Sequence, residues 1–217
     1  MLDKGVACHQ AGDLNGALNI YNTILRKKPL NPDALWLKGA VFVQLEQPLK
    51  AIKVLQKAVK FRPSDPMIWN DLGMAYEANL DIALSRHAFE KAFSLDPKTL
   101  VIRINRARCL FLDGQADEAL IQIDSAIALD GTLGAAHNVR GLILKKIEKV
   151  QDAAKAFSSA MLCEPQNLEF MLNKAQLLIL LKQFNESEKI VLLARKLSKP
   201  GSKYWINATT MLGVSLS

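Results

Sequence analysis

The sequence predicts an all-α solenoid of about six helix–turn–helix units followed by one partial terminal helix. A small residue recurs at a constant interval, once per unit, at Gly5, Gly39, Gly73, Ala107, Gly141 and Ala175. A large apolar residue follows each of them in the second helix, at Tyr21, Leu55, Phe89, Ile123, Phe157 and Val191. A helix-terminating residue then closes the first five units, at Pro29, Pro63, Pro97, Gly131 and Pro165. Because six copies keep this register without an insertion, chance is excluded.

The unit boundaries follow from this register. We expect one continuous solenoid over residues 1–217, divided at about 1–31, 32–65, 66–99, 100–133, 134–167 and 168–201, with a partial unit at 202–217. The first unit begins inside its first helix, turns at residues 11–13 and continues as a helix over residues 14–27. Pro32 and Pro48 each mark a first helical turn, where proline is tolerated.

Residues 198–203, SKPGSK, are predicted to break the register before one more first helix that has no partner. Both ends of the chain therefore read as cut, and the last helix is expected to expose Met211, Leu212, Val214 and Leu216. This predicts either a segment of a longer repeat protein or self-association through the terminal helices.

The unit at residues 66–99 resembles the tetratricopeptide repeat. It carries the helix–turn–helix signature at Trp69, Leu72, Gly73, Tyr76, Phe89, Ala92 and Pro97, with Ser85 in place of the usual first Ala. The other units depart mostly at the Trp position, which holds Leu35, Arg103, His137 and Met171. The resemblance covers nearly the whole chain. It implies a right-handed superhelix whose first helices line a concave groove that binds a peptide or a helix of another protein.

Composition narrows the class of protein. No apolar run is long enough for a membrane span, and the N-terminal residues lack the apolar stretch of a signal peptide. Cys8, Cys109 and Cys163 are far apart in sequence, which predicts free thiols in a reducing compartment, the cytoplasm. The net charge of +7 is compatible with an acidic partner or with an ordinary lysine-rich surface.

The sequence predicts no enzyme. It contains no Gly-rich phosphate loop, no HExxH and no GxSxG, and its three histidines lie in different units. We therefore expect no catalytic residue, no metal and no cofactor. His137 occupies the Trp position, where we expect a packing role.

The predicted site is the groove. By the positions that the resemblance assigns to the concave face and its neighbours, the peptide-binding residues are Trp36, Met67, Asn70, Met74, Ile104, Asn105, Arg108, Phe111, Asn138, Leu142, Lys145 and Asn173. The apolar residues supply burial, the asparagines hold a peptide backbone, and Arg108 and Lys145 set a preference for acidic groups. Trp36→Ala or Ile104→Asp should then weaken binding and leave helicity unchanged. Two alternatives remain: these side chains pack on neighbouring units, or another part of the chain fills the groove.

Several functions compete with a protein-binding scaffold. The basic series Lys4, Lys38, Arg106, Arg140 and Lys174 lacks interleaved aromatic residues, so nucleic-acid binding is not expected. The groove also lacks the basic and asparagine clamp that family members use for a terminal carboxylate. A recognition arm of a larger enzyme, such as a glycosyltransferase or a sulfotransferase, is the main alternative, and self-assembly is the third.

Overall fold

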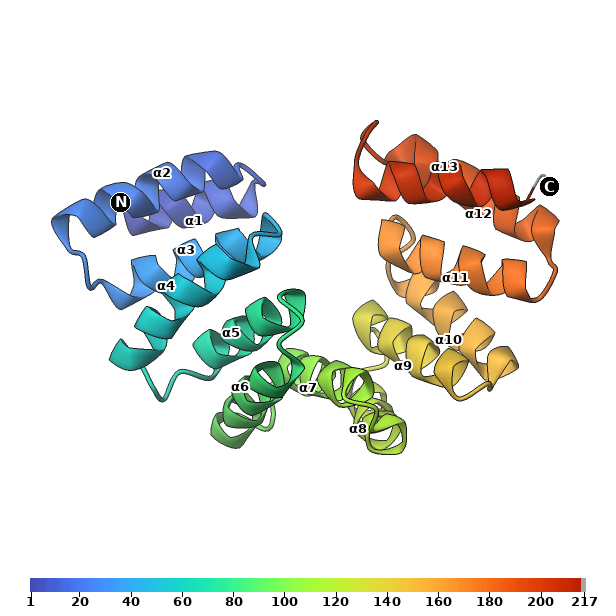
Figure 1. The fold of residues 1–217 in the computed structure, drawn as a ribbon, viewed down its shortest axis with the longest axis horizontal. Helices are drawn as coiled ribbons and strands as arrows, with labels where there is room; N and C mark the ends of the chain where they lie inside the picture. The colour runs from blue at the N-terminus through green and yellow to red at the C-terminus, as the bar shows by residue number, and fades with distance from the viewer. Residues whose placement is uncertain (216–217) are drawn as a thin grey trace. The chain divides into compact units, whose positions relative to one another are not determined.

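The computed structural model describes residues 1–215, with side chains to residue 213, and among them it shows thirteen α-helices and no strand (Figure 1). The helices are α1 Leu2–Gln10, α2 Leu14–Lys27, α3 Pro32–Gln44, α4 Pro48–Phe61, α5 Pro66–Ala78, α6 Ile82–Leu95, α7 Leu100–Leu112, α8 Ala116–Leu129, α9 Gly134–Lys146, α10 Val150–Cys163, α11 Leu168–Leu180, α12 Phe184–Leu197 and α13 Lys203–Ser215. The predicted all-α class and the number of units are confirmed.

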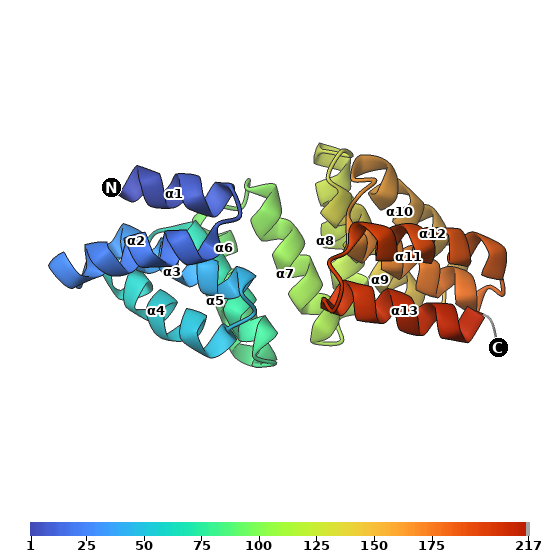
Figure 2. The same cartoon turned by 90° about the horizontal axis from the view of Figure 1, so that it is seen from above.

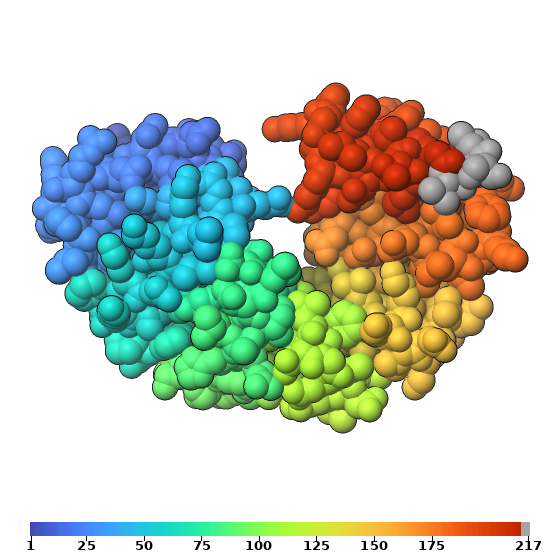
Figure 3. All heavy atoms as spheres, viewed as in Figure 1, coloured from blue at the N-terminus to red at the C-terminus, as the bar shows by residue number. Residues whose placement is uncertain are grey.

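The chain forms two compact units, Met1–Gly114 and Gln115–Ser217, and each is described by itself. Within each unit, successive helix pairs lie in chain order (Figures 2 and 3). One continuous solenoid over residues 1–217 stays a prediction.

Within each compact unit, first helices pack against the next first helix, whereas no two second helices contact each other over the described residues. In the first unit α3 contacts both α1 and α5, and in the second unit α11 contacts both α9 and α13. By contrast, α4 contacts only α3 and α5 among the described residues. The first helices of a compact unit therefore lie closer to one another than its second helices do. We call the side of each unit that its first helices form the first-helix face.

Local sequence signals set the helix ends. Asp13, Asn31, Asp65 and Asn167 each accept a hydrogen bond from a backbone N–H of the helix that follows, at 2.8–3.1 Å for the shortest bond of each. Prolines occupy the first turn of α3, α4 and α5. The predicted helix at residues 14–27 and the predicted starts at Pro32 and Pro48 are confirmed.

The expected break in register before the last helix is wrong. Helix α13 begins at Lys203, close to the position that an unbroken register would give. Its Trp205 is in register with Met171 of the preceding unit, and its Ala208 and Leu212 are buried against α11 and α12. Met211 is half-buried, and the predicted exposure of Val214 and Leu216 concerns side chains outside the described ones.

The turn between the two helices of each pair needs a left-handed residue. Such residues recur once per helix pair, at Gly12, Glu46, Leu80, Gly114, Glu148 and Lys182, with φ between 55° and 85°. Glycine adopts this conformation without steric cost, but a residue with a Cβ atom does not. Four of the six turns therefore hold a strained residue.

The two helices of a pair meet where the small residue of the first faces the large residue of the second. A Cβ atom added at Gly73 would lie 2.7 Å from Phe89 Cε1, and one added at Gly141 would lie 2.6 Å from Phe157 Cδ1. In the pair α11–α12 the small residue is Ala175, and it shares its core with the smaller Val191. A smaller side chain on the second helix thus accompanies a larger one on the first helix.

Three chemically different residues at the Trp position make the same hydrogen bond. The Trp69 indole donates to the carbonyl of Pro63 at 2.8 Å, and the Arg103 guanidinium donates to that of Pro97 at 2.9 Å. Nε2 of His137 lies 2.9 Å from the carbonyl oxygen of Gly131. Each bond ties the start of a first helix to the loop before it, which explains why the Trp signature is relaxed without loss of the fold.

The contact at Gly73 yields a testable coupling. Gly73→Ala should lower the free energy of unfolding by about 1–2 kcal/mol, because overpacking against Phe89 outweighs the gain in helix propensity. In the Phe89→Ile background the same change should cost at least about 1 kcal/mol less, a coupling that a double-mutant cycle measured by urea unfolding detects. Strictly additive single changes would show that the two residues do not limit the approach of α5 and α6.

The left-handed turn yields a second prediction. Leu80 is 83% exposed at φ 64°, so Leu80→Gly should raise the free energy of unfolding by roughly 1 kcal/mol. The reverse change at the equivalent turn, Gly12→Leu, should lower it by a similar amount. Thermal unfolding followed by circular dichroism measures both, and a loss of stability in Leu80→Gly would contradict the strain at this position.

Candidate functional site: the first-helix faces

The structure places the twelve predicted groove residues in two classes of exposure. Four are buried, namely Asn70, Ile104, Asn105 and Asn138. Eight are half-buried, namely Trp36, Met67, Met74, Arg108, Phe111, Leu142, Lys145 and Asn173. Trp36 packs against the core of the first unit and Leu142 against that of the second. Packing on neighbouring helices therefore accounts for part of this set.

The asparagines bond to each other across adjacent first helices. Asn105 Nδ2 donates to Asn70 Oδ1 at 2.9 Å, and Asn173 Nδ2 donates to Asn138 Oδ1 at 2.9 Å. The Nδ2 of Asn138 also donates to Glu169, at 3.2 Å. These amides link the first helix of one pair to the first helix of the next pair. In this structure they are therefore not available as an open row for a peptide backbone.

The cations of the predicted site also have partners. Arg108 Nε lies 2.9 Å from Glu77 Oε1, and Lys145 Nζ donates to Gln176 Oε1 at 2.8 Å. Burial lowers the pKa of the Lys145 ammonium. A ligand that uses either cation must share it with the existing partner.

Ile104 is unsuitable as a mutational probe of binding. Its side chain is only 4% exposed. Ile104→Asp would bury a carboxylate, which costs stability, so from the structure we expect this variant to lose helicity.

Asp71 is an unusual carboxyl group on the face of the first unit. Its Oδ2 accepts a hydrogen bond from the Trp36 indole at 2.7 Å, and its Oδ1 accepts one from Asn70 at 3.3 Å. Burial raises the pKa of Asp71 to about 6, and the Asp65 charge adds to that rise, although both hydrogen bonds oppose it. Trp36–Asp71 links α3 to α5 with the same 35-residue spacing as the two asparagine pairs.

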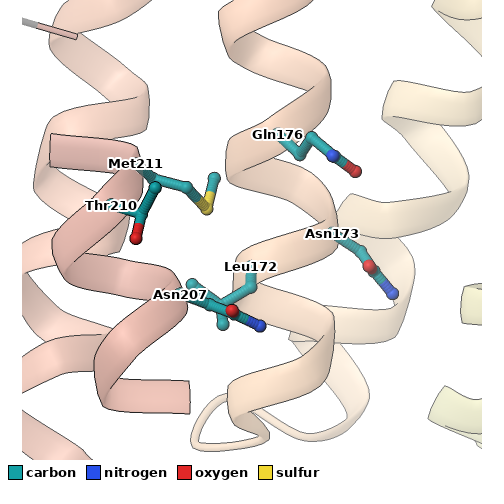
Figure 4. A pocket seen from close by; sticks show the side chains of 6 residues that line it. All are labelled: Leu172, Asn173, Gln176, Asn207, Thr210 and Met211. Carbon is teal, nitrogen blue, oxygen red and sulfur yellow. The ribbon is translucent and has the colours of Figure 1, made fainter. Parts of the chain in front are cut away.

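A pocket lies between α11 and α13 in the second unit (Figure 4). It has a volume of about 320 Å³ and is lined by Leu172, Asn173, Gln176, Asn207, Thr210 and Met211. Asn207 and Met211 reach from α13 toward α11. A second hollow of about 300 Å³ shares Gln176, Thr210 and Met211 and adds Lys145, Ile179 and Leu180. Together they form what we call the α11–α13 pocket.

This pocket combines apolar surface with amide groups. Its apolar lining includes Leu180, which is 62% exposed, and the half-buried Ile179 and Met211. Exposed apolar side chains next to groups that both donate and accept hydrogen bonds are typical of a surface that binds protein segments.

The prediction from sequence missed the α13 half of this pocket. Asn207, Thr210 and Met211 were not predicted as site residues because the stretch after residue 198 was expected to lose the register. The equivalence of Met171 and Trp205 in the repeat is the signal that reveals it. Leu180 and Gln176 were also not among the predicted binding residues.

Side chains suited to catalysis or metal binding are dispersed. Over the described side chains there is no group of three His, Cys, Asp or Glu residues placed to hold a metal ion. All three cysteines are free, and burial raises the pKa of the Cys109 thiol, which disfavours the reactive thiolate. Across residues 1–215, no helix combines the length and the apolar character that crossing a bilayer requires. The cytoplasm, the self-association and the exclusion of nucleic acid stay predictions.

Asp71 yields a prediction of pH dependence. Its folded pKa of about 6 lies above the ordinary value of 3.8, so the folded protein binds more protons than the unfolded chain between these values. Stability must therefore fall as pH rises through this window. Relative to Asp71→Asn, the parent should lose about 2 kcal/mol of unfolding free energy between pH 4 and pH 7, measured by urea unfolding. A difference that stays constant with pH would show that Asp71 titrates normally.

The chain is similar to repeat-containing proteins of several kinds. The family model described as "Tetratricopeptide repeat" matches residues 2–66 and 70–133. A DnaJ homolog subfamily C member 7 homolog of Schizosaccharomyces pombe is 29% identical over 164 residues, 68% of this chain and 34% of that protein. Anaphase-promoting complex subunit 3 of the same organism is 26% identical over 122 residues, 56% of this chain and 18% of that protein. A probable UDP-N-acetylglucosamine–peptide N-acetylglucosaminyltransferase, SPINDLY, of Hordeum vulgare is 24% identical over 156 residues, 69% of this chain and 16% of that protein.

The chain thus spans about a third or less of the length of these relatives. Among solved structures, the anaphase-promoting complex assembly Cut9–Hcn1 matches all of this chain and 42% of its own, with a TM-score of 0.84 at 15% identity. The protein TTC0263 of Thermus thermophilus matches 82% of this chain and 97% of its own, with a TM-score of 0.72 at 18% identity. These structures support the fold. Since the family model matches more than half of the sequence, the chain belongs to the tetratricopeptide repeat family.

Proposed function

We propose that this chain is a non-catalytic protein-interaction module that binds a segment of a partner protein on its first-helix faces. The observation that carries the proposal is the α11–α13 pocket, where exposed apolar side chains adjoin amide groups. Burial of Leu180 by a partner would supply the driving force. The side chains of Asn207 and Gln176 would hold the partner's backbone, since an amide both donates and accepts.

The face of the first unit supports the same function with a different chemistry. Trp36, Met67 and Met74 are half-buried on neighbouring helices, and Trp36 is held in place by its bond to Asp71. Aromatic and methionine side chains of this kind are enriched at protein interfaces. A fixed tryptophan loses little conformational freedom on binding, which favours it as an anchor.

The relatives favour a role in assembly. One is named as a subunit of the anaphase-promoting complex and another as a DnaJ homolog subfamily member, and both names belong to proteins that are longer than this chain. For this chain they support an interaction role and leave the partner to be identified.

A second candidate function is a recognition arm attached to an enzyme. The observation that favours it is the similarity to SPINDLY, of which the chain matches 16%. The reading frame beyond Ser217 discriminates the two: a transferase domain there would favour the arm, and a stop codon would contradict it.

The proposed function predicts a contrast between two exposed leucines of the second unit. Leu180 borders the pocket on α11, and Leu162, which is 81% exposed, lies on the second helix α10. Peptides should be selected from a displayed random library against the parent chain, and their affinities measured by fluorescence anisotropy. Leu180→Asp should weaken the selected peptides at least about ten-fold, since it places a charge at the apolar anchor, whereas Leu162→Asp should change affinity by less than about two-fold.

The control is matched in residue type, charge change and exposure, so both variants should keep parental circular dichroism. Equal losses of affinity in the two variants, or no loss in Leu180→Asp, would show that the selected peptides do not bind at the α11–α13 pocket.

A further inference from the structure

Helices α2 and α4 of the first unit carry no acidic residue. With the residue after α2 they hold seven cations, which are Arg26, Lys27, Lys28, Lys50, Lys53, Lys57 and Lys60. This number equals the net charge of the whole protein, +7. The rest of the chain therefore has a formal net charge of zero.

The lysines of α4 form one exposed stripe. Lys50, Lys53, Lys57 and Lys60 follow each other at intervals of three or four residues, which puts them on one side of the helix. All four are exposed, and none forms an ion pair within the part of the chain that the structure describes.

A fifth lysine joins this stripe from α3. Lys38 Nζ lies 5.7 Å from the centre of the Phe42 ring, and Lys50 Nζ lies 5.8 Å from the same centre. Burial and the nearby charge of Lys57 both lower the pKa of Lys38. Like charges are thus brought together around one half-buried ring. We call Lys38, Phe42, Lys50, Lys53 and Lys57 the α3–α4 basic patch.

Two equivalent cations elsewhere in the chain are neutralised by an acid at a constant offset. Arg106 Nε lies 2.7 Å from Glu90, and Arg140 Nε lies 2.6 Å from Asp124. Each acid lies on the preceding second helix, at the same offset from its cation. The same offset from Lys38 falls on Asn22. The uncharged amide of Asn22 thus occupies the position at which Glu90 and Asp124 supply the counter-charge to Arg106 and Arg140.

We propose that the α3–α4 basic patch is a second interaction surface, distinct from the α11–α13 pocket, and that it docks an acidic segment of a partner protein. Carboxylates of that segment replace the missing counter-charges beside Lys38, Lys50 and Lys57. Charge complementarity of this kind accelerates association and selects among partners.

The composition of the patch favours a protein segment over other polyanions. It contains lysine and no arginine, so it lacks the forked donors that favour phosphate groups. Its one ring, Phe42, is half-buried and lies 5.7 and 5.8 Å from two lysine Nζ atoms, which leaves little of it to stack on a base or to enter a bilayer. Flexible carboxylate side chains, in contrast, can reach point charges spaced along a helix surface.

The experiment compares two charge-reversal variants of the full chain. The probe is a short fluorescent peptide of alternating Glu and Gly residues, titrated at low ionic strength. The triple change Lys50→Glu, Lys53→Glu and Lys57→Glu should weaken binding roughly ten-fold or more. The control, Lys149→Glu, Lys189→Glu and Lys196→Glu, alters net charge equally on exposed positions of the second unit, and it should weaken binding by less than about two-fold.

Two outcomes would overturn the proposal. Equal losses in both triple variants would show that the peptide senses only net charge. Tighter binding of phosphatidylserine vesicles or of oligouridylate than of the peptide, lost in the α4 variant, would assign the patch to a membrane or to nucleic acid.

Asn22→Asp should raise the stability of the fold and lower the affinity of the α3–α4 basic patch for the peptide. It offers Lys38 an internal partner, as Glu90 does for Arg106, so thermal stability should rise slightly. Peptide affinity should fall about two- to three-fold, because one attractive charge is neutralised. Unchanged affinity together with higher stability would show that Lys38 takes no part. Leu180→Asp should leave this peptide's affinity unaltered, which keeps failure of the patch distinguishable from failure of the α11–α13 pocket.

Discussion

Within each compact unit, a helix pair closes where a first-helix residue with no side chain or only a methyl group meets a large apolar side chain of the second helix. The contact fixes how near the two helices lie, and hence which side of each first helix remains for the neighbouring unit. At Gly73 a single added carbon would collide with the Phe89 ring, and where Ala175 stands the facing core residue has shrunk to Val191. Close packing of this kind leaves the remaining first-helix surface free to vary.

The variable residues of the first helices fall into two groups. One set of polar residues links successive first helices through bonds such as Asn105–Asn70 and Trp36–Asp71, all with the same 35-residue spacing. The remainder, including Leu180 and Asn207, stays open to solvent. The second helices also differ from one another in charge. Glu90 neutralises Arg106, whereas the uncharged Asn22 stands at the same offset from Lys38. The proposed recognition by this chain therefore involves the α3–α4 basic patch as well as the α11–α13 pocket.

The helices were predictable because their signals are local. Pro32, Pro48 and the capping Asp13 act within one turn, and the constant register of the repeat carries each helix start from one unit to the next. The groove was less predictable, because its facing depends on contacts between successive units that propensity does not reveal. Asn70 and Asn138 look like ligands for a peptide in the sequence, yet each accepts a bond from the next unit. The strain at Leu80 is likewise invisible without the backbone.

The central claim is that partner segments bind the first-helix faces, and chemical-shift mapping tests it most directly. A labelled chain titrated with a library-selected peptide should show its largest amide shifts in α11 and α13, around Leu180 and Asn207. Shifts confined to the second helices α10 and α12 would contradict the account.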